Sequence, residues 1–397
     1  MGSNDRHLCS KSAFLEGAAA TEPTICLTWL TEKPVWVDQW RLSSEKADAL
    51  RTLVDEQLQQ GCIVPTTSQW NTPVSVIKKK SGKWRLLHDL RQVNAVIEDM
   101  GALQPGMPSP TMIPRNCDII VMDLKDSFFI IPLAPEDALR FAFSLPSVNH
   151  QEPMQRYHWT VLPQEMKNSP TICQIYVAKA LSTVHQQYPD IIWYHYMDDI
   201  LLAGKTPEAL TPVIRDTLVS LKAYGLQLAP EKTQRQAPWK YLGWKILEHA
   251  IEPQAVKLQT DIKTLNDLQK LLGSINWVRT FLGIDSSVLE PLFDLLKGAP
   301  TLASSPSLTT AAQEDLAEVS QVICHRQAQR IQEGKGFNKG YVINQSKQPV
   351  GLLAQWNEDE EKDPLSIIEW IFLPHQPQKI IVTCVKMFSL LIRKGHR

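Results

Sequence analysis

Apolar side chains recur at the spacing of an amphipathic helix in four segments of the chain. In the first, residues 43–60, the apolar positions Leu50, Val54 and Leu58 share one face, a serine precedes the run and Gly61 follows it. The same periodicity predicts helices over residues 168–181, 212–224 and 265–281. Gly225 follows the third of these segments, which is where a helix commonly ends.

Short apolar runs predict strands between these helices. Residues 72–77 and 84–87 form two such runs, joined by a basic turn, and residues 119–123 form a third that ends in an acid. Residues 191–203 contain two apolar runs around a tight turn, and residues 341–355 and 367–373 predict two further strands separated by an acidic turn at 357–363. Helices and strands follow one another along the chain without an internal repeat.

Proline and small polar residues mark the boundaries between parts of the chain. Residues 103–114 contain four prolines in twelve positions, which excludes a helix and predicts an extended linker between two lobes. Residues 298–320 are rich in Ser, Thr, Ala and Pro and predict the start of a different lobe. At 397 residues with 43% hydrophobic content, the chain is long enough for several lobes.

The charge balance restricts the class of protein. The 41 Lys and Arg residues nearly equal the 42 Asp and Glu residues, which excludes a uniformly basic nucleic-acid arm and an acidic disordered tail. Seven cysteines without a C-x-x-C pair favour a reducing compartment and argue against a zinc site. No apolar run reaches the roughly 18–20 residues of a membrane helix, so we expect a cytoplasmic protein that is neither secreted nor membrane-bound.

Three acids stand at the ends of apolar strands. Asp123 ends one run, and Asp198 and Asp199 lie in the turn between two others. Carboxylates presented by neighbouring strand ends predict a site for divalent cations such as Mg²⁺, and two such ions could promote an in-line phosphoryl transfer. An Asp-Asp pair is also ordinary turn chemistry. The flanking apolar residues favour the metal site, because buried strands rarely place two charges at their junction without a ligand.

Two motifs carry a resemblance to a known family. YMDD within IIWYHYMDDILLA and the segment VMDLKDSFFIIPL resemble the metal-binding motifs of retroviral reverse transcriptases, and betaretrovirus-like and endogenous retroviral polymerases are the most similar. The resemblance runs from LTWLTEKPVWVDQW at residue 27 to EWIFLPHQ at residue 376. It implies that Asp123, Asp198 and Asp199 are catalytic and bind two Mg²⁺ ions, with Mn²⁺ as a possible substitute.

The resemblance also implies a fold and its divisions. We expect a right-hand polymerase fold of the α+β class, with fingers, palm, thumb and a partial connection subdomain. The expected boundaries are an N-terminal tail at 1–27, fingers at 28–98 and 131–168, palm at 99–130 and 169–248, thumb at 249–310 and partial connection at 311–397.

Six positions match residues that contact the incoming nucleotide in this family. A basic cluster at residues 78–91 supports a phosphate-binding role, although it would also suit a solvated hairpin. An aromatic ring at Phe128 would exclude a 2′-hydroxyl by its size, whereas without the family it would be assigned to the core. Lys232 would act as a general acid near the triphosphate, its alternative being a surface lysine. The six residues are Lys79, Arg85, Phe128, Gln164, Met197 and Lys232.

Six further positions match residues that contact the primer or template. The segment WKYLGWKI resembles the primer grip, and LNDLQKLLGSINWVR resembles the thumb helix that follows the minor groove. In that helix three residues share one face at i, i+4 and i+8, and the glycine among them predicts a close approach by the duplex or, alternatively, by another helix. The six residues are Tyr196, Leu242, Gly243, Gln269, Gly273 and Trp277.

Several departures from the family pattern bear on activity. Glu165 stands where the family usually has glycine, and its carboxylate would repel a triphosphate or divert a metal ion, while its side chain could strain the backbone. Arg41 and Thr280 each replace a proline. The chain also stops within the expected connection, so we expect no ribonuclease H domain and no integrase.

These observations lead to one main hypothesis and two alternatives. The main hypothesis is an RNA-directed DNA polymerase that extends a primer on an RNA or DNA template with dNTPs, with its activity impaired by Glu165. The first alternative is a non-catalytic nucleic-acid-binding relic. The second is a partner subunit, in a homodimer or in a heterodimer with a longer polymerase chain. A cytoplasmic or virus-particle location would fit each of them.

Overall fold

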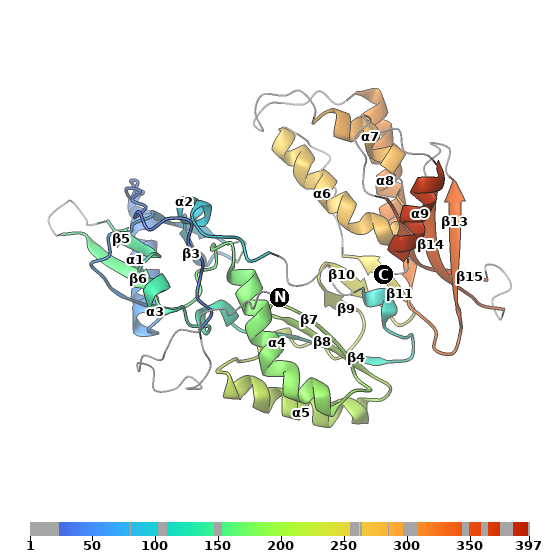
Figure 1. Cartoon of the computed structure of the whole chain (residues 1–397), viewed down its shortest axis with the longest axis horizontal. Coiled ribbons are helices and arrows are strands. Elements are labelled where there is room, and N and C mark those ends of the chain that lie inside the picture. The colour runs from blue at the N-terminus through green and yellow to red at the C-terminus, as the bar shows by residue number, and fades with distance from the viewer. Residues whose placement is uncertain are drawn as a thin grey trace, which may run out of the picture. The chain divides into compact units, whose positions relative to one another are not determined.

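The computed structural model describes residues 24–79, 81–101, 109–146, 153–254, 262, 264–284, 286–296, 309–343, 349–358, 364–373 and 384–395. The chain forms two compact units. The first contains Met1–Met107, Met122–Ile200 and Glu208–Thr233, and the second contains Pro108–Val121, Leu201–Pro207 and Gln234–Arg397. Helices and strands alternate in both units (Figure 1), which confirms the expected mixture of α and β structure.

The N-terminal part of the first unit combines one long helix with two small sheets. Helix α1 (Ser44–Gln59) buries Leu50 and Val54 and contacts the antiparallel hairpin of β2 (Val74–Lys78) and β3 (Trp84–His88), as the sequence predicted. The second sheet has the order β1-β6-β5 and is antiparallel. Its strands are β1 (Ile63–Pro65), β5 (Ala142–Leu145) and β6 (Gln155–Trp159). The same unit also contains two short helices, α2 (Arg91–Ala95) and α3 (Pro135–Ala138).

The strands that carry the predicted acids form a separate sheet with the order β4-β8-β7. These strands are β4 (Asp118–Asp123), β7 (Ile192–Tyr196) and β8 (Asp199–Gly204), and their buried side chains include Ile120, Met122 and Leu202. Helices α4 (Ser169–Gln187) and α5 (Pro207–Ala223) run close to one another beside these strands (Figure 1). They are joined where Ser220 Oγ donates to the carbonyl of Ala180 at 2.5 Å.

One predicted boundary in this region is wrong. Helix α5 begins at Pro207 rather than at Pro212, which lies inside it. Buried Leu210 and Val213 lie on either side of Pro212, so the apolar face continues through the proline. Packing of that face outweighs the backbone hydrogen bond that proline cannot make.

The second unit begins with a small antiparallel sheet and three helices. The sheet order is β12-β11-β10-β9, with β9 (Trp239–Tyr241), β10 (Trp244–Ile246), β11 (Ala250–Pro253) and β12 (Ala328–Gln329). Helices α6 (Leu265–Leu282), α7 (Ser286–Asp294) and α8 (Thr310–His325) share one apolar core. The predicted lobe boundary at 298–320 is therefore wrong from Thr310 onward, because α8 contributes Leu316 and Val319 to that core; residues 298–308 lie outside the described part.

The last part of the second unit is a three-stranded antiparallel sheet with one helix against it. The order is β13-β14-β15, formed by β13 (Phe337–Ile343), β14 (Pro349–Trp356) and β15 (Leu365–Ile371), and helix α9 (Cys384–Gly395) contacts β14 and β15. The run 341–355 predicted as one strand belongs to two strands, and residues 344–348 between them are not described. Trp370 of β15 lies against Gly283, which follows α6, so the sheet and the helix are packed together.

Several predictions fall wholly or partly outside the described residues. They concern the N-terminal tail before residue 24, most of the proline-rich linker and the acidic turn at 359–363. The described end of the linker forms a short 3-10 turn, Pro110–Met112. Among the helices that are described, none combines the length and apolar character required to cross a bilayer.

A buried histidine predicts how acid affects the first unit. Trp159 Nε1 donates to His88 Nδ1 at 3.1 Å, so the Nε2–H of a neutral imidazole donates to Thr72 Oγ1 at 2.7 Å. Burial lowers the pKa of His88 from 6.5 to about 3. Below about pH 6.5 the unfolded chain binds a proton that the folded chain does not bind, so stability falls by about 1.4 kcal/mol per pH unit until the folded pKa is reached.

His88→Gln should reduce this pH dependence. Between pH 7 and pH 5 we expect the free energy of unfolding of the first unit to fall by about 2 kcal/mol less in the variant than in the original chain. Urea unfolding at the two pH values measures the difference, and the comparison cancels contributions from other titrating groups. Equal pH dependence in both proteins would contradict a neutral buried His88.

Candidate active site at the turn between β7 and β8

The three predicted acids lie at adjoining strand ends in the first unit. Asp123 is the last residue of β4, Asp199 is the first residue of β8, and Asp198 lies in the turn after β7. The turn is tight because Met197 adopts a left-handed conformation with φ of 52°. The backbone N–H of Leu124 donates to the carbonyl of Asp198 at 2.8 Å, which joins the end of β4 directly to the turn.

The acids affect one another electrostatically. Burial, followed by the charges of Asp198 and Asp123, raises the pKa of Asp199 from 3.8 to about 6. Burial raises the pKa of Asp198 as well, with a further contribution from Asp123. The site therefore concentrates negative charge in a partly desolvated place, where a cation is stabilising.

Lys232 supplies a positive charge at this site. Its Nζ lies 2.7 Å from Asp123 Oδ1, and this hydrogen bond raises the pKa of the lysine. The side chain is 58% exposed, so the pair is accessible to a competing anion. Lys232 is thus a surface lysine that is paired with one of the three acids, and its role near the triphosphate stays a prediction.

The donor set fits a hard divalent cation. The three acids supply carboxylate oxygens, which are the ligands that Mg²⁺ and Mn²⁺ prefer. The raised pKa values of Asp198 and Asp199 reflect a charge repulsion that a bound cation would relieve. Within the described residues, no group of three His, Cys, Asp or Glu side chains already has the spacing of a metal site. Asp123 is instead turned onto Lys232. The acids thus carry the right chemistry, while their present arrangement is that of an ion-paired cluster.

Gln174 is a residue that the sequence analysis missed. From helix α4 its Oε1 accepts a hydrogen bond from the backbone N–H of Met197 at 2.6 Å, and its Nε2 donates to the carbonyl of His195 at 3.2 Å. The side chain therefore bonds the backbone on both sides of Tyr196, immediately before the turn that carries the acids. No motif marks Gln174, because its role depends on the packing of α4 beside β7.

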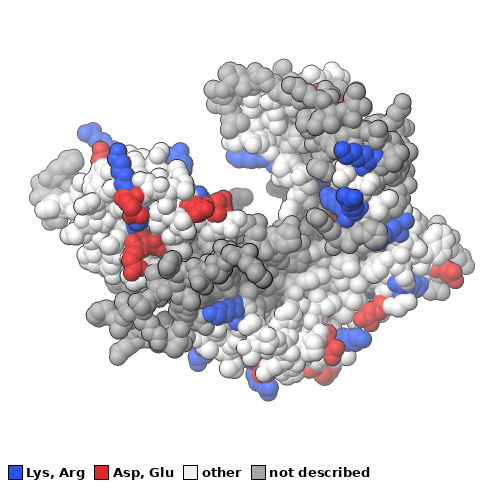
Figure 2. Space-filling view, in the orientation of Figure 1, with Lys and Arg blue, Asp and Glu red and all other residues white. Residues whose placement is uncertain are grey.

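The predicted nucleotide contacts are only partly brought together. Arg85 Nη2 donates to Gln164 Oε1 at 2.7 Å, although 79 positions separate the two residues. Lys79 is exposed and its backbone N–H closes the β2–β3 turn on Lys83. Phe128 lies half-buried in the 3-10 turn Ser127–Phe129, beyond the end of β4. On the face drawn in Figure 2, basic and acidic side chains lie in small groups, several of them beside one another.

The predicted primer contacts other than Tyr196 lie in the second unit. Tyr196 ends β7 in the first unit. Leu242 and Gly243 form the tight turn between β9 and β10, with φ of 45° and 82°. A Cβ on Gly243 would lie 3.5 Å from Trp277 Nε1, so this turn is close to the exposed face of α6.

The exposed face of α6 is open at Gly273. Gln269, Gly273 and Trp277 are all exposed, and a Cβ at position 273 would meet nothing within 4 Å among the described residues. No described helix of this chain approaches Gly273, and both predicted occupants of this face, a duplex or another helix, stay predictions. The open face leaves space for a partner.

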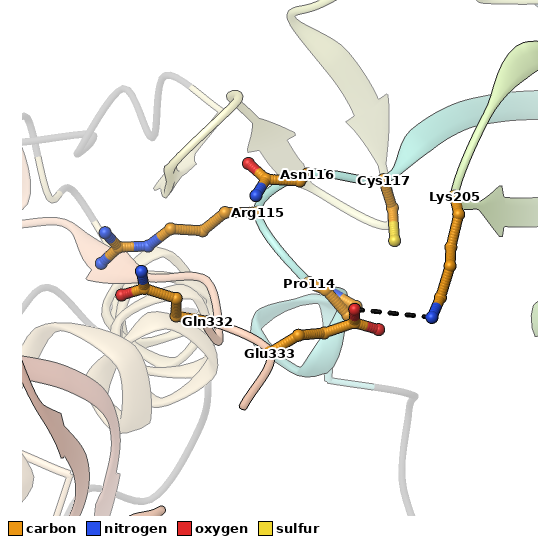
Figure 3. A pocket seen from close by; sticks show the side chains of 7 residues that line it. All are labelled: Pro114, Arg115, Asn116, Cys117, Lys205, Gln332 and Glu333. Atoms are coloured by element: carbon orange, nitrogen blue, oxygen red, sulfur yellow. Dashed lines mark ion pairs between the residues drawn. The ribbon is translucent and has the colours of Figure 1, made fainter. Parts of the chain in front are cut away.

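The second unit contains a small cavity whose lining includes none of the three acids. It has a volume of about 30 Å³, enough for a water molecule, and Figure 3 shows the residues that line it. Lys205 and Glu333 form an ion pair of 3.7 Å across it. The other residues that line it are Pro114, Arg115, Asn116, Cys117 and Gln332.

Comparisons with known proteins match the chain in three places. Residues 77–246 match the family described as reverse transcriptase (RNA-dependent DNA polymerase), and residues 253–317 match the reverse transcriptase thumb domain. Residues 346–397 match an ERVK-8-like, RNaseH-like domain. This last match corrects the expectation that the chain contains nothing of a ribonuclease H domain. The described part of that region consists of β14, β15 and α9.

The chain is also similar to retroviral polyproteins. It is 47% identical over 371 residues to the Gag-Pro-Pol polyprotein of sheep pulmonary adenomatosis virus, a match that covers 93% of this chain and 21% of the relative. The corresponding protein of simian retrovirus SRV-2 is 48% identical over 371 residues (93% and 20%), and that of mouse mammary tumor virus is 44% identical over 373 residues (94% and 21%). The chain thus spans about a fifth of the length of these relatives.

Proposed function

The chain belongs to the reverse transcriptase family, and we propose that it is an RNA-directed DNA polymerase whose active site is the acidic cluster at the β7–β8 turn. The observation that carries the proposal is the joining of Asp123 to the turn of Asp198 and Asp199, with Lys232 paired to the first acid. Its substrates would be dNTPs and a primer annealed to an RNA or DNA template.

The reaction is a nucleotidyl transfer. The primer 3′-hydroxyl oxygen forms a bond to the α-phosphorus of the dNTP, the hydroxyl proton passes to solvent water, and the bond from that phosphorus to the bridging oxygen of pyrophosphate breaks. Asp123, Asp198 and Asp199 would hold two Mg²⁺ ions. When bound, these ions supply charge stabilisation for the attacking and leaving oxygens.

Lys232 has two roles in this proposal. In the present structure its ammonium group offsets the charge of Asp123. Its exposure allows it to exchange that carboxylate for a phosphate oxygen of the nucleotide. From there it would give a proton to the leaving pyrophosphate, as a general acid does.

The remaining predicted residues would bind and select substrates. Arg85, held by Gln164, and the exposed Lys79 would bind the triphosphate, and Phe128 would exclude a 2′-hydroxyl by its size. Met197, in the left-handed position before Asp198, would border the bound nucleotide. Tyr196, the Leu242–Gly243 turn and the open α6 face of Gln269, Gly273 and Trp277 would contact the primer and template.

The proposal includes the division of the chain into tail, fingers, palm, thumb and partial connection. It also includes the predicted location in the cell and the predicted dimer. The thumb match at 253–317 lies close to the expected thumb at 249–310. A cytoplasmic or virus-particle location and a homodimer or heterodimer remain predictions.

Primer extension tests the proposed function. The purified full chain, given oligo(dT) annealed to poly(rA), dTTP and Mg²⁺ or Mn²⁺, should lengthen the primer. A reaction without the template measures untemplated addition. If the protein binds the duplex in a salt-sensitive way but lengthens no primer with either metal, the non-catalytic relic becomes the better hypothesis.

A further inference from the structure

The side chain of Glu165 lies beside the guanidinium of Arg85. Arg85 Nη2 is 3.8 Å from Glu165 Oε1 and 2.7 Å from Gln164 Oε1, so two consecutive residues hold one arginine. The Arg85 and Glu165 side chains are 41% and 46% exposed. The ion pair is therefore open to solvent and to a ligand that arrives from solvent.

The loop that carries Glu165 is fixed by hydrogen bonds. Asn94 of α2 donates to the carbonyl of Glu165 at 2.9 Å and accepts from the backbone N–H of Lys167 at 3.0 Å. Asn168 donates to the carbonyl of Glu98 at 2.9 Å and accepts from the N–H of Met100 at 3.2 Å. These contacts hold the backbone of residues 165–168 in place, so the position of the carboxylate is not left to a freely moving loop.

The backbone at Glu165 is not strained. Positive φ values among non-glycine residues of the described chain occur at Asp126, Met197 and Leu242, and Glu165 is not one of them. The expectation that a side chain at this position could strain the backbone is therefore wrong. Backbone strain therefore does not account for an effect of Glu165 on activity, whereas its charge and its contact with Arg85 are features that the structure shows.

We propose that Glu165 is a built-in competitor of the nucleotide for Arg85, and that it sets the affinity of the site for dNTPs. The inference rests on the proposed function, in which Arg85 binds the triphosphate. An incoming nucleotide must displace the Glu165 carboxylate from the guanidinium, and its negative phosphates approach a negative side chain that the fixed loop holds in place. Both effects weaken binding before any chemistry takes place.

The expected effect is moderate in size because the pair is half-exposed. Ion pairs of this kind change an equilibrium by only a few-fold in water. We therefore expect Glu165→Gln to tighten dNTP binding by roughly two- to fivefold. Gln164 and the backbone contacts of Glu165 are unchanged in this variant, so Arg85 stays in position.

Equilibrium binding of dNTP measures this directly. The full chain is bound to a primer–template whose primer ends in a dideoxynucleotide, so that no turnover occurs, and dTTP is titrated with Mg²⁺ present. Glu45→Gln is the matched control, because it removes the same charge from an ion pair with Lys78 of 3.9 Å in the same unit. The control should bind dTTP as the original chain does.

A double-mutant cycle identifies the route of the effect. In an Arg85→Gln background, Glu165→Gln should tighten dTTP binding by a clearly smaller factor than in the original chain, because the competition for the guanidinium is gone and only the direct repulsion between Glu165 and the phosphates is relieved. Unchanged or weaker binding in Glu165→Gln, or the same tightening without Arg85, would overturn the proposal, as would an equal gain in Glu45→Gln.

Primer extension separates this inference from the proposed function. If the chain polymerises, Glu165→Gln should lower the KM for dTTP by the same factor and leave kcat within about twofold. If no variant extends a primer while dTTP affinity still rises in Glu165→Gln, the polymerase proposal fails and the competition stands. Failure of every variant to bind dTTP would overturn both.

Discussion

Asp198→Asn should reduce primer extension by roughly 10³-fold or more, which corresponds to about 4 kcal/mol of transition-state stabilisation. The substitution keeps the size of the side chain and removes the charge at the centre of the acidic cluster. The carbonyl of Asp198 that accepts from Leu124 is part of the backbone and is unaffected. The loss should therefore appear in kcat, with little change in the affinity for primer–template.

A matched control separates catalysis from general charge effects. Asp118 begins the strand that Asp123 ends, so Asp118→Asn removes one carboxylate from the same strand at its far end. Extension by this variant should stay within about threefold of the original chain. Extension undiminished in Asp198→Asn, or an equal loss in Asp118→Asn, would rule out the assignment of the acidic cluster as the active site.

The acids could be found from sequence because they interrupt local patterns. A strand that ends in Asp123 and a turn that places two charges between apolar runs are signals within a few residues. Both appear in the structure as β4 and the β7–β8 hairpin. The turn predicted as the primer grip is similarly local. Only Leu242 and Gly243 lie between the end of β9 and the start of β10, and a two-residue hairpin turn requires left-handed conformations at both.

Residues that act across the fold could not be found in this way. Gln174 supports the Met197 turn only because α4 packs beside β7, and nothing in the helix sequence distinguishes it from other polar positions. The contact of Glu165 with Arg85 joins residues 80 positions apart on a loop and a strand. Proline rules also failed at Pro212, where the packing of the apolar face overrides a local preference.

Arg330 is another residue that no sequence pattern marks, and its side chain connects two segments of the second unit. It is fully buried, and burial lowers the pKa of its guanidinium from 12.5 to about 10. Its side chain donates to the carbonyls of Ile113, at 3.1 Å, and of Pro114. It also donates to those of Leu247 and Glu248, at 2.9 and 3.0 Å. One side chain thus connects the end of the linker to the turn between β10 and β11.

Arg330→Met should destabilise the second unit by about 3–5 kcal/mol. Methionine fills much of the same volume, but it leaves four carbonyl oxygens without their charged donor, and each hydrogen bond to a charged group contributes about 1.5–3 kcal/mol before the cost of burying the charge is subtracted. Arg330→Lys should recover only part of the loss, because an ammonium cannot reach four carbonyls in a planar fan.

Hydrogen exchange followed by mass spectrometry locates this effect within the chain. In Arg330→Met, amides of β10 and β11 should exchange roughly 10²- to 10⁴-fold faster, while those of β2 and β3 in the first unit keep their protection. Arg235→Met is the control, since Arg235 is exposed in the same unit. Unchanged protection of β10 and β11 in Arg330→Met would show that the four carbonyls find other donors, and that the buried guanidinium is not what holds these segments together.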